Sequence, residues 1–258
     1  IKGTLLGIVA GFFFPVCVCG IVPVVRRLLV KKVPTHAAVA FLLSAPIVNP
    51  ITIWATATAF SYNMQVALLR ILMAVVVAFL TAGLVSLKFP TASDFLKTNS
   101  IDEVSVIHER GIAASHSRFN WSAVLDDMEH EFFEVLQFLI FGAFLASLLQ
   151  VYVPKQVLTN VGQHPVFSVL AMMLLAVCLS LCAEADAFVA RTMAFHFSYG
   201  GVLGFMVMGQ MIDIKNALLM FKNFKAKGLW IMFILSFLLV LIGCISINLI
   251  SLKLSLWR

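Results

Sequence analysis

The chain has 258 residues, of which 62% are hydrophobic and 12% are charged, and its mean hydropathy is +1.04. Ordinary soluble domains are about 45–50% apolar and about 25% charged, so this composition excludes a soluble domain and indicates an integral membrane protein. The net charge is +6 at pH 7. Because basic residues beside membrane spans orient a membrane protein, we expect the lipid bilayer as the partner and no nucleic acid.

Seven apolar stretches are long enough to cross the hydrocarbon of a bilayer, which takes about 20 residues in a helix. They are residues 3–25, 35–61, 65–87, 132–153, 165–190, 198–221 and 228–252. The sequence therefore predicts an all-α integral membrane protein. Residues 88–131 form the only long polar stretch. We expect a solvated linker there, because its apolar positions are too few to form a core.

An internal repeat relates the two halves of the chain. At an offset of 164 residues, Asn49 aligns with Asp213, and the spans that follow them also correspond. We predict two homologous repeats of broken transmembrane helices, the first over residues 1–87 and the second over residues 132–258. Since the second repeat has one span more than the first, we expect an eighth span before Ile1 in the complete protein.

The relative direction of the repeats stays open at this stage. Lys and Arg of the loops divide 11 to 5 between the two sides if all seven stretches cross, and 12 to 4 if the two cysteine-containing stretches are re-entrant. Both divisions are compatible with a bias of positive charge toward one side. Full crossing gives parallel repeats of four spans, and re-entry gives inverted repeats of three, a common transporter plan.

The first stretch contains PVCVCGIVP, from Pro15 to Pro23. Its two prolines and Gly20 weaken helical hydrogen bonding, which is tolerated at membrane depth only where protein or a water-filled cavity receives the backbone. We predict a broken functional segment at residues 15–23, with a kinked packing helix as the alternative. For Gly3, Gly7 and Gly11, which recur every fourth residue, we predict close helix packing.

Two acidic residues, Glu184 and Asp186, interrupt the fifth apolar stretch. A charge at the centre of a span costs about 2.5–3.5 kcal/mol on insertion scales, so it is seldom kept without a role. We predict that these acids couple transport to an ion gradient. The structural alternative is a buried ion pair with Arg191 or Lys215, or a protonated carboxyl.

The segments SAPIVNP and GQMIDIKN occupy corresponding places in the two halves. Broken helices at matching positions of two repeats point to a site between them, where free helix ends hold an ion or a polar group. Asn49 and Asp213 are the strongest predicted binding pair, and Asn216 and Lys215 accompany Asp213.

Cys17 and Cys19 lie two residues apart in the first stretch. Thiolates suit thiophilic species, but buried cysteines also serve as small apolar packing residues, and both interpretations stay open. We find no metal-ligand spacing, no phosphate-binding loop and no HExxH, GxSxG or CxxC motif. We therefore expect no metal site, no cofactor and no enzymatic activity.

At these residues the chain resembles the bacterial predicted-permease family that includes the organoarsenical efflux permeases. The matching stretches run from Phe12 to Ile51, from Leu179 to Ala190 and from Phe205 to Asn216. The resemblance implies eight spans, efflux across a bacterial inner or plasma membrane, and contact of Cys17 and Cys19 with a trivalent, thiol-seeking substrate. Gly20 stands where the arsenical branch has a serine.

Two functional hypotheses follow. The first is a gradient-driven permease that moves a small solute or ion through a midplane site between the repeats, with Cys17 and Cys19 contacting the solute if it is thiophilic. The second is a non-transporting membrane subunit or scaffold, whose partner is another subunit or a second copy of the chain. In the second case the buried acids serve only as ion pairs.

Overall fold

The computed structural model describes residues 2–14, 18–89, 95–97, 136, 140, 165–194 and 197–254. Within these residues every regular element is a helix, apart from one isolated antiparallel bridge between Leu96 and Phe224, which confirms the all-α prediction. The helices are α1 (Lys2–Phe13), α2 (Val18–Val30), α3 (Thr35–Val48), α4 (Pro50–Ala59), α5 (Met64–Lys88), α10 (Pro165–Leu179), α11 (Ala183–Met193), α12 (Tyr199–Met211), α13 (Ile214–Asn223) and α14 (Ala226–Leu254).

Four helical segments in the described residues are long and apolar enough to cross a membrane. They are Thr35–Ala59, Met64–Lys88, Tyr199–Asn223 and Ala226–Leu249. The first comprises α3 and α4 and the third comprises α12 and α13, so each of these two segments contains a break. The predicted span 132–153 lies outside the described residues except for Leu136 and Ile140, as does most of the linker. The count of seven spans stays a prediction.

The stretches 3–25 and 165–190 each contain two helices, α1 with α2 and α10 with α11. In the first, α1 runs in the same direction as α3, because Gly3 lies beside His36 and Gly11 beside Ala45. Since α2 ends only a few residues before α3 begins, α1 and α2 form a hairpin that returns to the end where it started.

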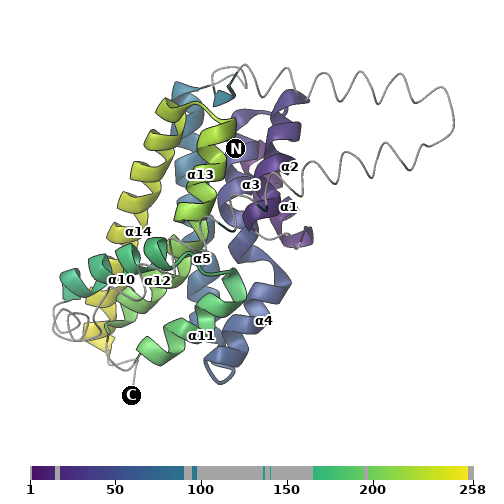
Figure 1. Cartoon of the computed structure of the whole chain (residues 1–258). Helices are drawn as coiled ribbons and strands as arrows, with labels where there is room; N and C mark the ends of the chain where they lie inside the picture. Colours follow the sequence, from purple (N-terminus) through teal and green to yellow (C-terminus); the bar gives the residue numbers. More distant parts are fainter. Residues whose placement is uncertain are drawn as a thin grey trace, which may run out of the picture.

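The second hairpin is built in the same way. The α10 helix runs in the same direction as α12, because Gly201 lies beside Ser168 and Gly209 beside Ala176. The chain then returns through α11 to the start of α12. In Figure 1, α1 and α2 lie toward one end of the molecule, whereas α10 and α11 lie toward the other.

The breaks within the long helices follow from local chemistry. Asn49 between α3 and α4 is extended (φ −71°, ψ 148°), as expected for a residue that precedes a proline. Pro50 has no N–H to donate to the carbonyl of Pro46, so the helix ends there. Ile212 and Asp213, which separate α12 from α13, are also extended.

The two central helices, α3 and α12, are buried on nearly all sides and pack against each other. Around them, α5 packs against α14, α2 against α13, and α4 against α11. The outer faces of α5 and α14 expose a large apolar side chain every fourth residue: Leu68, Leu72, Val76, Leu80 and Leu84 on α5, and Trp230, Ile234, Leu238 and Ile242 on α14. Such all-apolar outer faces are what a helix presents to lipid.

Candidate functional site

Arg70 is the centre of a buried polar network. It lies in the second turn of α5, within an otherwise apolar helix, and is only 1% exposed. A guanidinium buried this deeply must be paired and hydrogen-bonded, because an isolated charge in a dry interior is very costly. The helices packed around it supply those partners.

Asp186, from the first turn of α11, is the ion-pair partner of Arg70. Arg70 Nη2 lies 3.1 Å from Asp186 Oδ2, and both side chains are almost fully buried. Gln210 of α12 donates from Nε2 to the same carboxylate oxygen at 2.9 Å. In the described part of the chain, the partner of Asp186 is therefore Arg70, not the Arg191 or Lys215 that the sequence analysis considered.

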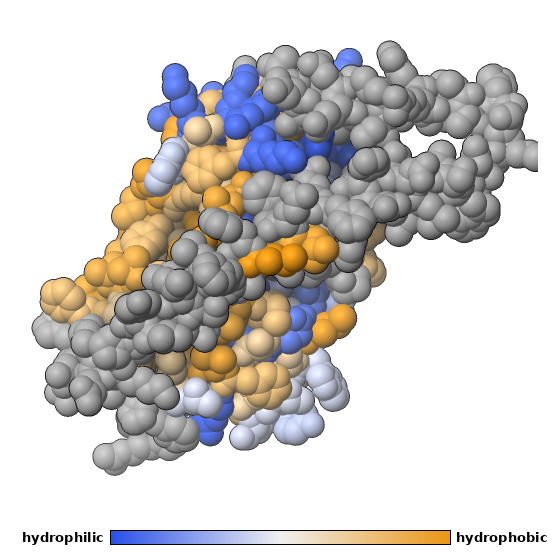
Figure 2. Space-filling view, viewed as in Figure 1, coloured by the Kyte–Doolittle hydropathy of each residue, from blue (hydrophilic) through white to orange (hydrophobic). Residues whose placement is uncertain are grey.

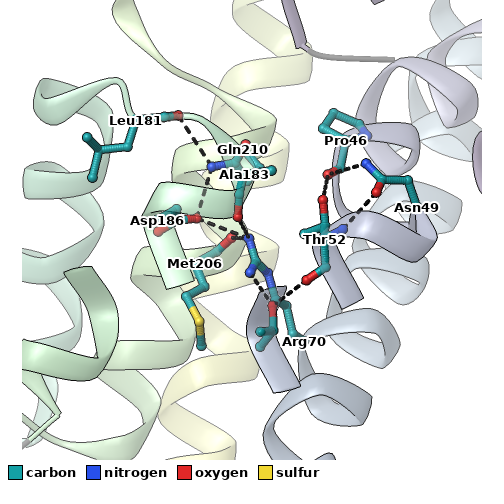
Figure 3. A network of polar contacts seen from close by, with 10 residues as sticks. Pro46, Asn49, Thr52, Arg70, Leu181, Ala183, Asp186, Met206 and Gln210 are labelled. Atoms are coloured by element: carbon teal, nitrogen blue, oxygen red, sulfur yellow. Dashed lines mark hydrogen bonds and ion pairs between the residues drawn. The ribbon is translucent and has the colours of Figure 1, made fainter. Parts of the chain in front are cut away.

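The remaining contacts of Arg70 extend to two more helices (Figure 3). Its Nη1 donates to Thr56 Oγ1 on α4 at 2.7 Å, and its Nη2 donates to the carbonyl of Met206 on α12 at 3.1 Å. The network thus joins α4 and α5 from the first half of the chain to α11 and α12 from the second. Within the part of the chain that the structure describes, three of its buried atoms have no hydrogen-bond partner: Arg70 Nε, Asp186 Oδ1 and Gln210 Oε1.

A chain of hydroxyl groups links this network to the break between α3 and α4. The carbonyl of Pro46, which Pro50 leaves without its helical donor, accepts from Thr52 Oγ1 at 3.1 Å. Thr56 Oγ1 donates to the carbonyl of Thr52 at 2.7 Å and accepts from Arg70. The broken backbone and the buried ion pair are therefore parts of one connected polar structure (Figure 3).

Asn49 and Asp213 have the contacts of helix N-caps. Asn49 Oδ1 accepts from the backbone N–H of Thr52 at 2.8 Å, and Asp213 Oδ1 accepts from the backbone N–H of Asn216. Both residues are buried, and these hydrogen bonds stay within their own breaks. The pair occupies corresponding places in α3–α4 and α12–α13, but a role in binding solute stays a prediction.

The break between α10 and α11 contacts the break between α12 and α13. Ser180 has a positive φ of 47°, and its Oγ accepts a hydrogen bond from the backbone N–H of Ile214 at 3.2 Å. In the first turn of α13, the buried Oδ1 of Asn216 has no hydrogen-bond partner among the residues described, and Lys215 is half-buried. Two broken segments of the second half thus meet at one place.

The other predicted site residues lie as follows. Glu184 is half-buried in the first turn of α11, and the Arg191 guanidinium lies 5.7 Å from the centre of the Phe60 ring near the end of that helix. Cys17 lies outside the described residues, and Cys19 lies in the first turn of α2. Where side chains are described, no three His, Cys, Asp or Glu residues gather as metal ligands.

Sequence reasoning missed Arg70, Gln210 and Thr56. The signal for Arg70 was present, because it is the only charged residue between Gln65 and Leu87. An ionisable residue inside an apolar span marks a functional site by default, with its partner to be named. For Gln210 and Thr56 the sequence carries no comparable signal, since uncharged polar residues are common in spans.

Removing the N-cap of α4 at the break between α3 and α4 is expected to lower the stability of the protein. An Asn49→Ala change deletes the oxygen that accepts from Thr52, which should cost about 1 kcal/mol of stability. Asn49→Ser restores a capping oxygen and should regain most of the loss. Thermal unfolding in detergent measures both, and an Ala variant as stable as the parent would contradict the capping role.

Taken together, the helices and the buried network define an integral membrane protein built from broken apolar helices around an internal ion pair. The chain belongs to the predicted permease family, whose family model matches residues 1–249. This confirms the resemblance noted from the sequence at the level of that family.

Two bacterial relatives are similar over most of their length. The chain is 38% identical over 249 residues to a Streptococcus mutans protein named "Putative two-component membrane permease complex subunit", covering 95% of this chain and 79% of the relative. It is 39% identical over 249 residues to the UPF0718 protein YcgR of Bacillus subtilis, covering 95% and 81%. No solved structure matches the chain.

Proposed function

We propose that this chain is a permease of the bacterial plasma membrane that moves a small solute or ion through a site at the depth of the helix breaks. Its family membership supports transport in general, and indicates a permease in place of an enzyme. The observation that carries the proposal is the buried Arg70–Asp186 ion pair, which joins the two halves and is linked by hydrogen bonds to the break between α3 and α4. Polar structure of this kind inside a membrane protein marks a pathway for solutes or ions.

The proposal includes two inverted repeats, over residues 1–87 and 132–258 and joined by the linker 88–131. The order α1–α2, α3–α4, α5 corresponds to α10–α11, α12–α13, α14. The packing supports this, because the contact of α2 with α13 corresponds to that of α11 with α4. The two hairpins begin at opposite ends, as the inverted arrangement requires (Figure 1).

Asp186 is the proposed coupling residue, assisted by Glu184. One oxygen of Asp186 contacts Arg70 and Gln210, while the other has no hydrogen-bond partner among the described residues and can take up a proton. A neutral carboxyl attracts Arg70 less than a carboxylate does, so protonation loosens the contact between α5 and α11. Loss of this contact would let the halves move relative to each other and expose the solute site to the other side.

The solute site would use the polar groups at the breaks. Asn49, Asp213 and Asn216 are the proposed binding residues. Arg191 and Lys215 are proposed as coupling or ion-pair residues, and Lys215 directly precedes Asn216 in the chain. Cys17 and Cys19 would contact a thiophilic solute, and the resemblance to the arsenical branch suggests efflux as the direction.

Proton flux into proteoliposomes tests this proposal. The protein is reconstituted and candidate thiophilic and anionic solutes are added, with Glu184→Gln, Asp186→Asn and a Cys17→Ser, Cys19→Ser double variant in parallel. We expect solute-dependent proton flux in the parent. In the acid variants we expect at least a tenfold loss of this flux, because the carboxyl group that would carry the proton is absent. Flux that is equal in parent and acid variants would refute the coupling role. Loss in the serine variant for thiophilic solutes alone would assign the cysteines to the solute.

A second candidate function is a subunit of a larger membrane complex. The name of the Streptococcus mutans relative, a subunit of a two-component permease complex, favours it. Purification of the chain from its native membrane with a stoichiometric partner would support this function. A wild-type phenotype of Asp213→Asn would point to a purely structural role for the buried acids.

A further inference from the structure

Seven exposed lysines gather at one end of the molecule, which we call the lysine end. They come from the α2–α3 connection, the end of α5, the segment that follows it, and the α13–α14 junction: Lys31, Lys32, Lys88, Lys97, Lys222, Lys225 and Lys227. Figure 2 shows hydrophilic side chains over this end and apolar side chains below it. In the sequence these residues are spread over almost 200 positions, so only the fold brings them together.

Backbone contacts fix two parts of the lysine end to each other. Residues 95–97 pair with the α13–α14 junction through the bridge of Leu96 with Phe224, and Lys225 N–H donates to the carbonyl of Phe95 at 2.9 Å. Phe95 is fully buried, with its ring 5.2 Å from that of Phe224. The end of α5 and the junction of α13 with α14 therefore lie on the same side of the membrane.

The start of α3 lies on that side as well. The segment of α3 and α4 crosses to the opposite end, and α5 returns after a short connection at residues 60–63. Lys31 and Lys32, which directly precede α3, thus belong to the same end as Lys88. At the opposite end, the described part of the chain carries Arg191 and Lys253 as its basic residues.

The lysines lie at the depth where the apolar surface stops. The lipid-facing series of α5 ends at Leu87, directly before Lys88, and that of α14 begins at Trp230, three residues after Lys227. Trp230 is 57% exposed, and tryptophan prefers the boundary between hydrocarbon and headgroups. The ammonium groups are therefore placed at the level of phospholipid phosphates.

The opposite end has its own interfacial aromatic pair. Trp54 and Tyr62 are 67% and 68% exposed, and their rings meet edge to face at 6.4 Å. Aromatic belts mark both boundaries of a membrane, whereas lysine and arginine concentrate on the cytoplasmic side. The acidic residues of the linker do not alter this, since Asp and Glu contribute little to orientation.

We propose that the lysine end faces the cytoplasm and binds the phosphate headgroups of anionic phospholipids in the inner leaflet. Anionic headgroups attract lysines that lie near the membrane surface, and each lysine adds to the attraction. This assigns both an orientation and a lipid-binding surface, and it holds whether the chain transports a solute or serves as a subunit.

Orientation is tested with two single substitutions in the full chain. Lys32→Cys places a thiol at the lysine end, and Ser61→Cys places one in the exposed connection at the other end. A membrane-impermeant maleimide should label Lys32→Cys only in inside-out vesicles and Ser61→Cys only in intact cells. The parent chain, with its five native cysteines, gives the background. The opposite labelling pattern, or labelling of both variants from the same side, would overturn the proposal.

Lipid binding is tested with a charge-removing variant and a charge-preserving control. In the first, Lys31, Lys32, Lys88 and Lys227 are changed to Gln, and in the second the same four are changed to Arg. Native mass spectrometry of the purified chain measures binding of phosphatidylglycerol against phosphatidylcholine. We expect the Gln variant to bind phosphatidylglycerol about tenfold or more weakly, with the Arg variant close to the parent and phosphatidylcholine unaffected. Equal phosphatidylglycerol binding by the Gln variant and the parent would overturn the proposal.

Discussion

An Arg70→Met variant is expected to lose most of its folded, monodisperse protein in detergent. The change leaves the Asp186 carboxylate buried, 1% exposed, with Gln210 as its one remaining hydrogen-bond donor among the described residues. Removing one partner of a buried ion pair typically costs about 3–5 kcal/mol, because the other charge stays uncompensated. Size-exclusion profiles and thermal unfolding of the purified variant measure the loss.

The double variant Arg70→Met, Asp186→Leu is the matched control. Replacing a whole buried ion pair by apolar residues of similar volume is often neutral or stabilising, so the double variant should regain most of the stability that the single variant loses. Arg70→Lys should be intermediate, since an ammonium keeps the charge but cannot donate to Thr56, Asp186 and Met206 with one planar group. If the single variant were as stable as the parent, the ion pair would not be essential to the fold.

The same double variant separates folding from function. If Asp186 carries the coupling proton, the double variant should fold as the parent does but should show no solute-dependent proton flux. A double variant that both folds and transports would leave the proposed coupling role without support, while leaving the family assignment intact. This distinction is useful because single changes at Arg70 or Asp186 confound loss of the fold with loss of the proton site.

The helix breaks could be predicted from the sequence because their causes are local. Pro50 removes one backbone donor, and the residue before it is forced out of the helical region. Asn49 and Asp213 then provide side-chain oxygens at the start of the next helix, which is a preference of N-cap residues. For the same reason, the four long apolar helices follow from the length of their apolar runs.

Pairing and direction could not be predicted, since they depend on tertiary packing. Arg70 and Asp186 are 116 residues apart in the chain, and no local pattern connects them. Apolar length also cannot separate a crossing helix from a hairpin of two shorter helices, which is why the sequence leaves both arrangements open for residues 3–25 and 165–190. The contacts of α1 with α3 and of α10 with α12 are what define the hairpins.

Those contacts can be tested at Gly7, where α1 crosses α3 at close range. A methyl group at Gly7 would collide with the carbonyl oxygen of Ala37 and would lie tightly against the backbone nitrogen of Phe41. Backbone atoms cannot move aside without shifting the whole helix, so Gly7→Ala is expected to cost about 1–3 kcal/mol, even though alanine favours the helix more than glycine does. Thermal unfolding in detergent, with the yield of monodisperse protein, measures this cost.

Gly83→Ala in α5 provides the matched control, since a methyl group there would meet no atom of the other described residues within 4 Å, apart from its own helix backbone and chain neighbours. Both changes add one methyl group and the same gain in helix propensity, so they differ only in what that methyl group meets. Gly83→Ala should therefore be neutral or stabilise the protein by up to about 1 kcal/mol. Opposite signs at the two positions would establish that α1 packs directly on the backbone of α3. Two changes of the same sign would instead mean that α1 lies farther from α3, which would contradict the hairpin of α1 and α2.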